Sequence, residues 1–215
     1  MWGKMLSINK LQCGFGGESR LIEELSFDVT PGQLRLVQGP SGCGKSTLLS
    51  VISGTVPAGL KWSGDIKLAG RVLNGVPAVQ RNIGLLFQDP LLFPHLSVGD
   101  NLAFGLARVK GSTTKAERQR AVEEALDVAA MTGFGDRDPA TLSGGQAARI
   151  GLMRSLIAEP DVLLMDEAFS ALDPELRQQF GGFVKDAVRE KNIPALLVSH
   201  DQGDSQFAGG DIIRL

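Results

Sequence analysis

The segment from residue 39 to residue 47 has the residue types and the spacing that point most directly to chemistry. It fits the pattern G-x-x-x-x-G-K-[ST] and consists of Gly39, Pro40, Ser41, Gly42, Cys43, Gly44, Lys45, Ser46 and Thr47. Its glycines allow successive backbone N–H groups to point inward at phosphate oxygens. An apolar run at 34–37 precedes it and a helical pattern at 46–53 follows it, so the start of a helix adds its positive dipole end. We expect this loop to bind nucleotide phosphates, with Lys45 on the β- and γ-phosphates and the Ser46 hydroxyl on Mg²⁺.

Two acidic residues, Asp166 and Glu167, follow an apolar run at 162–165 that predicts a buried strand. An Asp at such a strand end can hold Mg²⁺ together with the hydroxyl of the phosphate-binding loop. A second carboxylate beside it can orient or deprotonate an attacking water molecule. An acidic strand exit is commonplace when it occurs alone, but downstream of a phosphate-binding loop the pair indicates hydrolysis.

His200 follows another apolar run, at 195–198, that also predicts a strand. A lone histidine is more often structural than catalytic. At the exit of a parallel strand in a phosphate-binding fold, however, it can contact the γ-phosphate and position the water. The other histidine, His95, is interpreted as a surface or packing residue.

A second glycine-rich segment comprises Leu142, Ser143, Gly144, Gly145 and Gln146. Ser143 and Gln146 have the spacing of a capping box, which predicts the start of a helix that continues through residue 157. Free N–H groups, a hydroxyl and a helix dipole end make a second anion site. Since one nucleotide does not need two γ-phosphate sites, we expect this one to serve the nucleotide bound to another copy of the chain. The alternative, a glycine that ends a helix, explains neither Ser143 nor the spacing.

Strand and helix patterns alternate in the segments that must position these residues. Alternating or short apolar runs at 25–29, 66–68, 71–73 and 83–87 predict β structure. From about residue 90 to 158 the pattern is helical, with capping-box spacing at Ser97 and Thr114. Strands return at 162–166, 195–199 and 212–215, and Asp173-Pro174 predicts a helix start. The expected fold class is α/β with a mainly parallel sheet and a helical insertion, and ligands should bind beyond the carboxyl ends of the strands.

Composition restricts the location and the partners of the chain. Its 215 residues carry 22 basic and 24 acidic side chains, a formal net charge of −2, and no basic stripe that would indicate a nucleic-acid partner. No apolar run approaches the roughly 18 residues of a membrane span. Residues 1–5 lack the apolar stretch of a signal peptide, and the two cysteines make no disulfide framework. We therefore expect a cytosolic protein that does not bind nucleic acid.

Together these motifs resemble those of the ATP-binding-cassette (ABC) ATPases, in the same order and over nearly the whole chain. Residues 39–47 resemble the Walker A motif, Gln88 resembles the Q-loop glutamine, and residues 142–146 resemble the signature motif. Asp166 and Glu167 resemble the end of the Walker B motif, residues 170–173 resemble the D-loop that ends in Asp173, and His200 resembles the switch histidine. Phe15 falls where the family places an aromatic residue, usually Tyr, that stacks on adenine.

The resemblance implies a fold and an activity. The fold would be that of a P-loop NTPase, with a RecA-like core, an N-terminal antiparallel β subdomain and a helical insertion subdomain. One domain would span 1–215, with 1–89 and 156–215 forming the α/β core and 90–155 the helical subdomain. Lys45, Glu167 and His200 would be catalytic, and Ser46, Gln88 and Asp166 would hold Mg²⁺. ATP would be bound by Phe15, residues 39–47, Gln88 and Asp173, and by residues 143–146 of a second copy.

Residues 91–98 and 139–146 resemble those of bacterial importer ATPases in particular. The implied partners are a second copy in an ATP-sandwich homodimer, integral membrane permease subunits, and a periplasmic binding protein reached through the complex. The protein would then lie peripherally on the inner face of the cell membrane. One departure is Gly151, inside the helix after the signature motif, which is expected to cost about 1 kcal/mol relative to Ala.

Three alternatives remain open at this point. The first is the ATPase of an export or lipoprotein-release complex. The second is a soluble ABC ATPase of DNA repair or translation, although these usually carry coiled-coil insertions or tandem cassettes. The third is a nucleotide-binding regulatory module without turnover, against which Glu167 and His200 argue.

Overall fold

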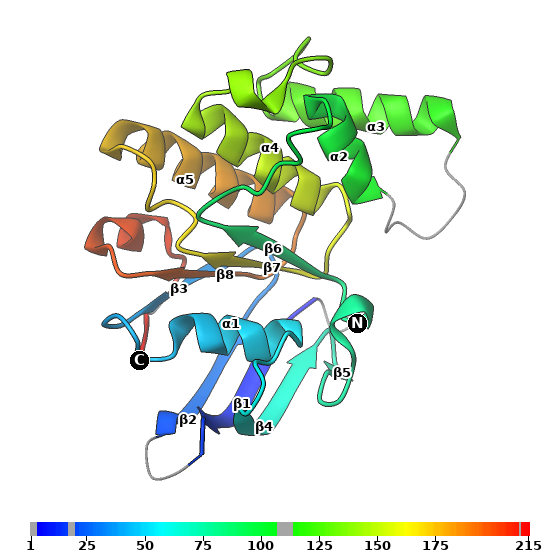
Figure 1. Cartoon of the computed structure of the whole chain (residues 1–215). Coiled ribbons are helices and arrows are strands. Elements are labelled where there is room, and N and C mark those ends of the chain that lie inside the picture. The colour runs from blue at the N-terminus through cyan, green and yellow to red at the C-terminus, as the bar shows by residue number, and fades with distance from the viewer. Residues whose placement is uncertain (1–3, 17–19, 107–113, 211) are drawn as a thin grey trace.

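The computed structural model describes residues 4–16, 20–106, 114–210 and 212–215 (Figure 1). Its strands are β1 (Leu6–Gly14), β2 (Arg20–Val29), β3 (Leu34–Gln38), β4 (Lys61–Leu68), β5 (Arg71–Val72), β6 (Ile83–Phe87), β7 (Val162–Asp166), β8 (Ala195–Ser199) and β9 (Ile213–Arg214). Its α-helices are α1 (Lys45–Ser53), α2 (Val98–Leu106), α3 (Lys115–Val128), α4 (Gly144–Leu156) and α5 (Pro174–Glu190). Its 3-10 helices are η1 (Ala78–Gln80), η2 (Pro139–Thr141) and η3 (Gln202–Phe207). The strands predicted at 83–87, 162–166 and 195–199 are confirmed, and the apolar run at 34–37 forms β3.

The central layer is a five-stranded sheet in the order β6-β7-β8-β3-β9, in which all paired neighbours are parallel. Its middle strands are continuous apolar runs because helices cover both faces of the sheet. Helix α1 packs on one face, while α4 and α5 pack on the other (Figure 1). The carboxyl ends of β6, β7, β8 and β3 therefore meet at a single edge.

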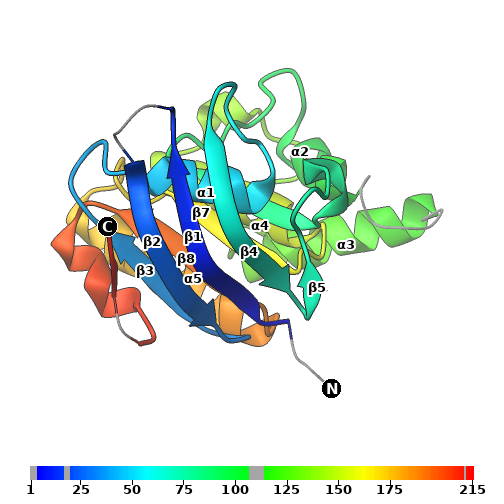
Figure 2. The same cartoon turned by 90° about the horizontal axis from the view of Figure 1, so that it is seen from below.

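A second sheet of four antiparallel strands, in the order β2-β1-β4-β5, lies on the far side of α1. Seen from below, it covers α1 and part of the parallel sheet (Figure 2). Apolar side chains of α1 share one core with both sheets. Helix α1 is thus held between two layers, which fixes the direction of its N-terminus.

Strand β1 was not predicted, because a bulge interrupts its alternation. The side chains that it buries are Leu6, Ile8, Leu11 and Cys13. The buried face therefore shifts by one residue in the middle of the strand, and the register with both neighbouring strands shifts there as well. Lys10 has a left-handed φ of 49° at this point. Gly64 of β4 packs against the bulge, where a Cβ would lie 2.5 Å from the carbonyl oxygen of Lys10.

Helices α2, α3 and α4 form a layer beyond the parallel sheet (Figure 1). The capping box predicted at Thr114 is present, since its side chain accepts from the N–H of Glu117 and the Glu117 carboxylate accepts from the N–H of Thr114. No helix in the described part of the chain is both long and apolar enough to cross a bilayer. The α/β fold class, with a mainly parallel sheet and an additional antiparallel sheet, is confirmed.

Candidate active site

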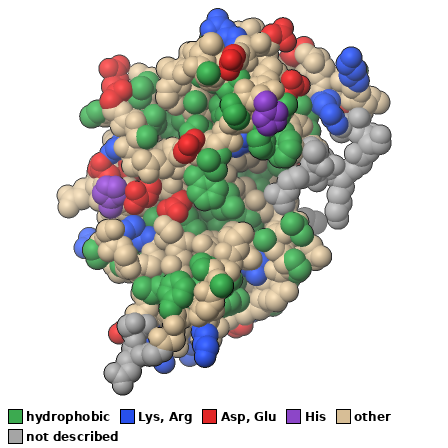
Figure 3. All heavy atoms as spheres, in the orientation of Figure 1, with side chains coloured by type: hydrophobic (Ala, Val, Ile, Leu, Met, Phe, Trp, Pro, Cys, Tyr) green, Lys and Arg blue, Asp and Glu red, His purple; other side chains and the backbone are tan. Residues whose placement is uncertain are grey.

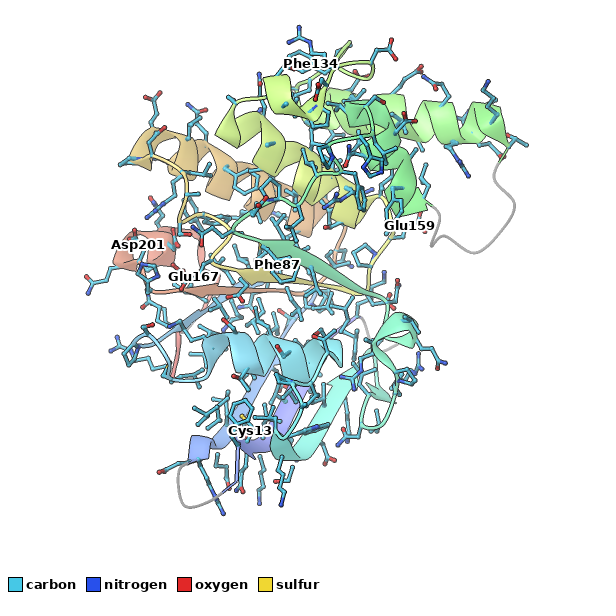
Figure 4. The ribbon with its side chains drawn as sticks, in the orientation of Figure 1. Cys13, Phe87, Phe134, Glu159, Glu167 and Asp201 are labelled. Atoms are coloured by element: carbon cyan, nitrogen blue, oxygen red, sulfur yellow. The ribbon has the colours of Figure 1, made fainter. Side chains whose placement is uncertain are left out.

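Four neighbouring strand exits bring most of the predicted site residues to one edge of the parallel sheet. Strand β3 leads into the phosphate-binding loop, β8 leads to His200, β7 ends at Asp166, and β6 leads to Gln88. The register pairs Asp166 with Val198 of β8 on one side and with Phe87 of β6 on the other. Figure 4 shows Glu167 close to this edge, with Phe87 on the neighbouring strand. The order of the strands, and not proximity in sequence, assembles the site.

The phosphate-binding loop needs its glycines for geometric reasons. Gly42 and Gly44 have left-handed φ values of 80° and 102°, which cost glycine little. A Cβ on Gly39 would lie 2.6 Å from the Sγ of Cys43 and 2.7 Å from the carbonyl oxygen of Leu215. Gly44 caps α1 without a side-chain hydrogen bond. The N–H groups of the first turn therefore face the loop, where they can bind an anion.

Lys45 folds back over this loop. Its Nζ donates to the carbonyl oxygens of Gly39 and Pro40, at 2.8 Å in each case. The side chain is buried, with 7% of its surface exposed. A cation is thus held at the N-terminus of α1, where its charge adds to the positive end of the helix dipole. Lys45 and the N-terminus of α1 thus bring positive charge to the loop, as the prediction of phosphate binding requires.

Ser46 and Asp166 meet across the gap between the loop and β7. The Ser46 Oγ donates to Asp166 Oδ1 at 3.1 Å. Burial raises the pKa of Asp166, the Ser46 hydrogen bond lowers it, and the charges of Glu167 and Lys45 raise and lower it respectively. A cation bound here would stabilise the ionised carboxylate. The hydroxyl and the carboxylate are hard oxygen donors of the kind that Mg²⁺ prefers.

Glu167 and His200 lie in contact. The Nδ1 atom of His200 is 3.1 Å from Glu167 Oε1, and both side chains reach solvent. Glu167 has a left-handed φ of 48°, and its N–H donates to the carbonyl oxygen of Val198 on β8. The predicted base and the predicted γ-phosphate ligand therefore form one pair.

A cavity of about 670 Å³ opens beside this pair. It is lined by Ser46, Phe87, Gln88, Asp89, Pro90, Asp166, Glu167 and Ala171. Gln88 thus lines the same cavity as Ser46 and Asp166, as the prediction that these three residues hold one Mg²⁺ requires. The described residues contain no group of three or more His, Cys, Asp and Glu side chains able to hold a metal. The donor set fits Mg²⁺ that takes few protein ligands and completes its shell with water and phosphate oxygens.

Phe15 lies just beyond the end of β1, with 54% of its surface exposed. Cys13, two residues earlier, pairs with Ile22 of β2. The side chain of Ile22 comes within 3.3 Å of the position that a Cβ on Gly44 would occupy. This sequence of contacts puts the segment with Phe15 next to the phosphate-binding loop. Among the described residues, no other aromatic ring contacts the ring of Phe15.

The helix start predicted at Ser143 is formed. Ser143 caps α4 in a reciprocal capping box with Gln146, and Ser143 and Gly144 are exposed. Among the described residues, no hydrogen bond joins this helix start to the phosphate-binding loop. Asp173, also assigned to nucleotide binding, caps α5 by accepting from the N–H groups of Glu175 and Leu176. The helix starts at Ser143 and Asp173 are thus both capped by their own side chains.

Two structural roles were missed from the sequence because they depend on long-range contacts. Arg154 of α4 donates to the carbonyl oxygens of Pro90, at 2.7 Å, and Leu91, at 2.8 Å, just after Gln88. Gly151, one turn earlier, allows Pro90 to pack closely on α4, since a Cβ on Gly151 would lie 2.8 Å from Pro90 Cβ. Gly151 is therefore a packing requirement, which explains a residue that is otherwise costly in a helix. Its close contact with a residue 61 positions away gives no local signal in the sequence.

The fold and the site define a class of protein. A glycine-rich loop between a strand and a helix, with an Asp and a Glu at the exit of a second parallel strand, is the arrangement of a P-loop nucleoside triphosphatase. Two features distinguish this chain from a P-loop nucleoside triphosphatase that has only the parallel-sheet core. They are the additional antiparallel sheet and the capped, glycine-rich helix start at Ser143.

Comparisons with known proteins agree with this assignment. The profile of the ABC transporter family matches residues 22–170. The ABC transporter ATP-binding protein YnjD of Escherichia coli K12 is 45% identical over 188 residues, which cover 87% of this chain and 85% of that protein. The spermidine/putrescine import ATP-binding protein PotA of Oleidesulfovibrio alaskensis is 43% identical over 88% of this chain, but over only 49% of its own length. The chain thus spans about half the length of PotA.

A solved structure shows the same architecture. The ATP-binding cassette MJ0796, solved as a dimer in a post-hydrolysis state with ADP and phosphate, superposes with a TM-score of 0.77 at 25% identity. The superposition covers 94% of this chain and 91% of that chain. The chain belongs to the ABC transporter family and is an ATP-binding subunit with the fold of an ATPase.

Proposed function

We propose that this chain is the ATP-hydrolysing subunit of an ABC importer, which works as an ATP-sandwich homodimer on integral membrane permease subunits. The observation that carries the proposal is the convergence of four strand exits, which puts Ser46 on Asp166 and Glu167 on His200 beside one cavity. A binding module without turnover has no need of a carboxylate and an imidazole paired at this position.

The residues have distinct roles in the proposed reaction. The loop at 39–47 and Lys45 hold the phosphates by backbone N–H groups and charge. Ser46, Asp166 and Gln88 would hold Mg²⁺, which supplies charge neutralisation of the phosphates when bound. Glu167 accepts a proton from the attacking water, and His200 contacts the γ-phosphate and orients the Glu167 carboxylate. Phe15 offers its exposed ring for stacking on the adenine base.

A second copy would complete each site. The helix start at Ser143–Gln146, exposed at Ser143 and Gly144, has free N–H groups, and no hydrogen bond among the described residues joins it to the phosphate-binding loop of its own chain. It would bind the γ-phosphate held by the partner, and Asp173 would lie at the same interface. MJ0796, whose fold this chain shares, was solved as a dimer. Closure on ATP and opening after hydrolysis would then be the motion delivered to the permease.

An apolar patch is available for a permease. Figure 3 shows hydrophobic side chains gathered in the middle of one face, with acidic side chains beside them. Figure 4 places Phe87, 42% exposed, in the middle of the same view. Farther along the chain, Leu91 and Phe104 are 54% and 55% exposed, and the Phe93 ring packs 4.7 Å from that of Phe104. The patch borders the cavity that contains Gln88, so a docked permease segment would touch both the site and residues 90–155, which we assign to the helical subdomain. The chain would then lie peripherally on the cytoplasmic face of the membrane.

Import is favoured over export by the relatives. PotA, at 43% identity, is an import ATP-binding protein, and a periplasmic binding protein would deliver cargo to such a complex. An exporter ATPase and a soluble ABC ATPase are the competing functions. Co-purification of the chain with its genomic neighbours distinguishes them, since an importer requires a permease and a binding protein.

The test of the proposed site is a comparison of Glu167→Gln with Asp166→Asn. Glu167→Gln keeps the shape of the side chain but cannot accept the proton, so we expect MgATP binding to persist while turnover falls by roughly 10²–10⁴-fold. Asp166→Asn should instead weaken Mg²⁺-dependent ATP binding, because it removes a charged oxygen ligand. Near-normal turnover by Glu167→Gln would show that the base lies elsewhere and would refute this assignment.

A further inference from the structure

Arg177, near the start of α5, connects the two loops that carry the predicted catalytic pair. Its side chain is 17% exposed. Nε donates to the carbonyl oxygen of Phe169 at 3.2 Å, and Nη2 lies 3.5 Å from the carbonyl oxygen of Ser170. Nη1 forms an ion pair with the carboxylate of Asp201. One guanidinium therefore contacts the segment after Glu167 and the segment after His200 at the same time.

The first of these segments is a tight turn held to Glu167. The N–H and the hydroxyl of Ser170 both donate to the Glu167 carbonyl oxygen, at 3.0 Å and 2.8 Å. The left-handed backbone of Glu167 costs of the order of 1–3 kcal/mol in a residue other than glycine, and it persists only where surrounding contacts fix it. Arg177 supplies such contacts, because it holds the carbonyl oxygens of Phe169 and Ser170 that point out of the turn.

The second segment is anchored just after His200. The Asp201 N–H donates to the Ser199 hydroxyl at 3.0 Å, and its carbonyl oxygen accepts from Gln38 at 3.0 Å. Its Oδ1 accepts from the Gly203 N–H at 2.7 Å, which leaves Oδ2 for Arg177. Asp201 is thus fixed on the sheet and offers one carboxylate oxygen to α5. Figure 4 shows Glu167 and Asp201 side by side at this edge.

Helix stability does not explain why a cation occupies this position. Arg177 lies in the N-terminal part of α5, where the helix dipole disfavours positive charge. A second acid, Asp204, is buried nearby, and its Oδ1 has no hydrogen-bond partner among the described residues. Burial raises the pKa of Asp204, while the Ser199 hydrogen bond and the charge of Arg177 lower it. The cluster therefore places a cation where the adjacent loops, and not the helix, require one.

We propose that Arg177 is a positioning residue for ATP hydrolysis. It fixes the turn that carries Glu167 relative to the loop that carries His200, and so keeps the carboxylate and the imidazole in contact at 3.1 Å. The ring of contacts runs from Glu167 through the Ser170 turn to Arg177, then through Asp201 to His200 and back to Glu167. Arginine suits this task because its planar fork of donors reaches two carbonyls and a carboxylate at once, whereas a lysine offers one point charge. This inference rests on the proposed function.

The kinetic test uses Arg177→Lys, which keeps the charge but loses the fork. Arg189→Gln is the matched control, since Arg189 is an exposed arginine on the same helix. In steady-state MgATP hydrolysis we expect kcat of Arg177→Lys to fall about 10–100-fold, as for other residues that orient a catalytic group. Its KM and ATP affinity should stay within about threefold of wild type, and Arg189→Gln should behave as wild type. Because partial unfolding also lowers the apparent kcat without changing KM, kcat is expressed per folded chain, with the folded fraction taken from circular dichroism.

The second readout is the NMR spectrum of the His200 imidazole. The chain has two histidines, so His95→Gln leaves a single imidazole to observe. Glu167→Gln should displace the His200 resonances, because an amide replaces the carboxylate in contact with Nδ1. If Arg177 holds that contact, Arg177→Lys should displace them as well, and adding Glu167→Gln to it should change little further. Asp201→Asn removes the ion pair with Arg177 from the side of the His200 loop. It is used in place of Arg177→Lys if that variant does not fold.

Two results would overturn the positioning role. One is turnover of Arg177→Lys within twofold of wild type, or a loss that appears equally in ATP affinity. The other is a His200 spectrum that neither Arg177→Lys nor Asp201→Asn alters. Failure of the proposed function is a distinct result, because the wild-type chain would then show no turnover while the spectrum still reported whether Arg177 controls the Glu167–His200 contact.

Discussion

Replacement of Gly151 by alanine tests the packing of the phosphate-site loops against α4. Alanine is the better helix former by about 1 kcal/mol, so helix propensity alone predicts a more stable protein. The structure predicts the opposite. A Cβ at this position would lie 2.8 Å from the Cβ of Pro90 and 3.4 Å from the Cδ1 of Leu86.

The size of the effect follows from the rigidity of the obstructing group. Pro90 cannot rotate away, because its ring is fixed and Arg154 holds its carbonyl oxygen at 2.7 Å. Insertion of a methyl group into such a packed contact costs about 1–3 kcal/mol. This cost exceeds the helix-propensity gain, so we expect a net loss of the order of 1 kcal/mol. For a chain of this size, that loss lowers the melting temperature by about 2–4 °C.

The assay is urea unfolding followed by circular dichroism, with Gly182→Ala as the matched control. Gly182 also lies inside a helix, α5, but a Cβ there would meet no atom within 4 Å. That variant should gain about 0.5–1 kcal/mol from propensity alone. If Gly151→Ala gains as much as Gly182→Ala, the contact between Pro90 and α4 does not exist as described, and the explanation of Gly151 is refuted.

Two further predictions concern Arg81, which is buried at the C-terminal end of α1, and Asp166, which lies in the site. Arg81 is 4% exposed and donates to the carbonyl oxygens of Val51, Ile52 and Val76. The first two belong to the C-terminal end of α1. Arg81→Met leaves these buried acceptors unpaired, so it should lower the free energy of unfolding in urea by about 2–4 kcal/mol. An unchanged midpoint would contradict that role. For Asp166, burial raises the pKa above its ordinary value of 3.8, so the ionised carboxylate is less favourable in the folded chain than in the unfolded chain. That destabilisation is absent below about pH 3.8, grows as the pH rises above it and is complete above the folded-state pKa, so nucleotide-free Asp166→Asn should melt above wild type at neutral pH by a margin that shrinks as the pH falls towards 3.8. A margin that does not depend on pH would show that ionisation of Asp166 is not its cause.

Local signals in the sequence account for much of the fold and for the composition of the site. The strand exits at Asp166 and before His200 are predictable because buried parallel strands are short apolar runs that stop sharply. The helix starts at Thr114 and Ser143 are predictable because a capping box depends on residues three positions apart. The start at Asp173 is predictable because an N-cap Asp is followed directly by Pro174. Each of these features is decided within a few residues of itself.

The remaining features depend on contacts that no local pattern contains. The β1 bulge at Lys10 is possible only because Gly64 lies across from it. Arg154 and Arg177 look like ordinary basic helix residues, and their partners are distinct only once α4 and α5 pack on the sheet. The direct contact of Glu167 with His200 likewise needs β7 and β8 to be neighbours, an order that the sequence does not specify.

The central claim is that two copies of the chain close around ATP, and the mass of Glu167→Gln in solution tests it most directly. The variant should bind MgATP but hydrolyse it too slowly to reopen. Light scattering during gel filtration should therefore give the mass of one chain, 22.8 kDa, or of a weakly associating dimer, without nucleotide, and a stable mass of two chains with MgATP. Adding Ser143→Arg should abolish the dimer but not ATP binding. A mass that MgATP leaves unchanged, although ATP is bound, would contradict the account.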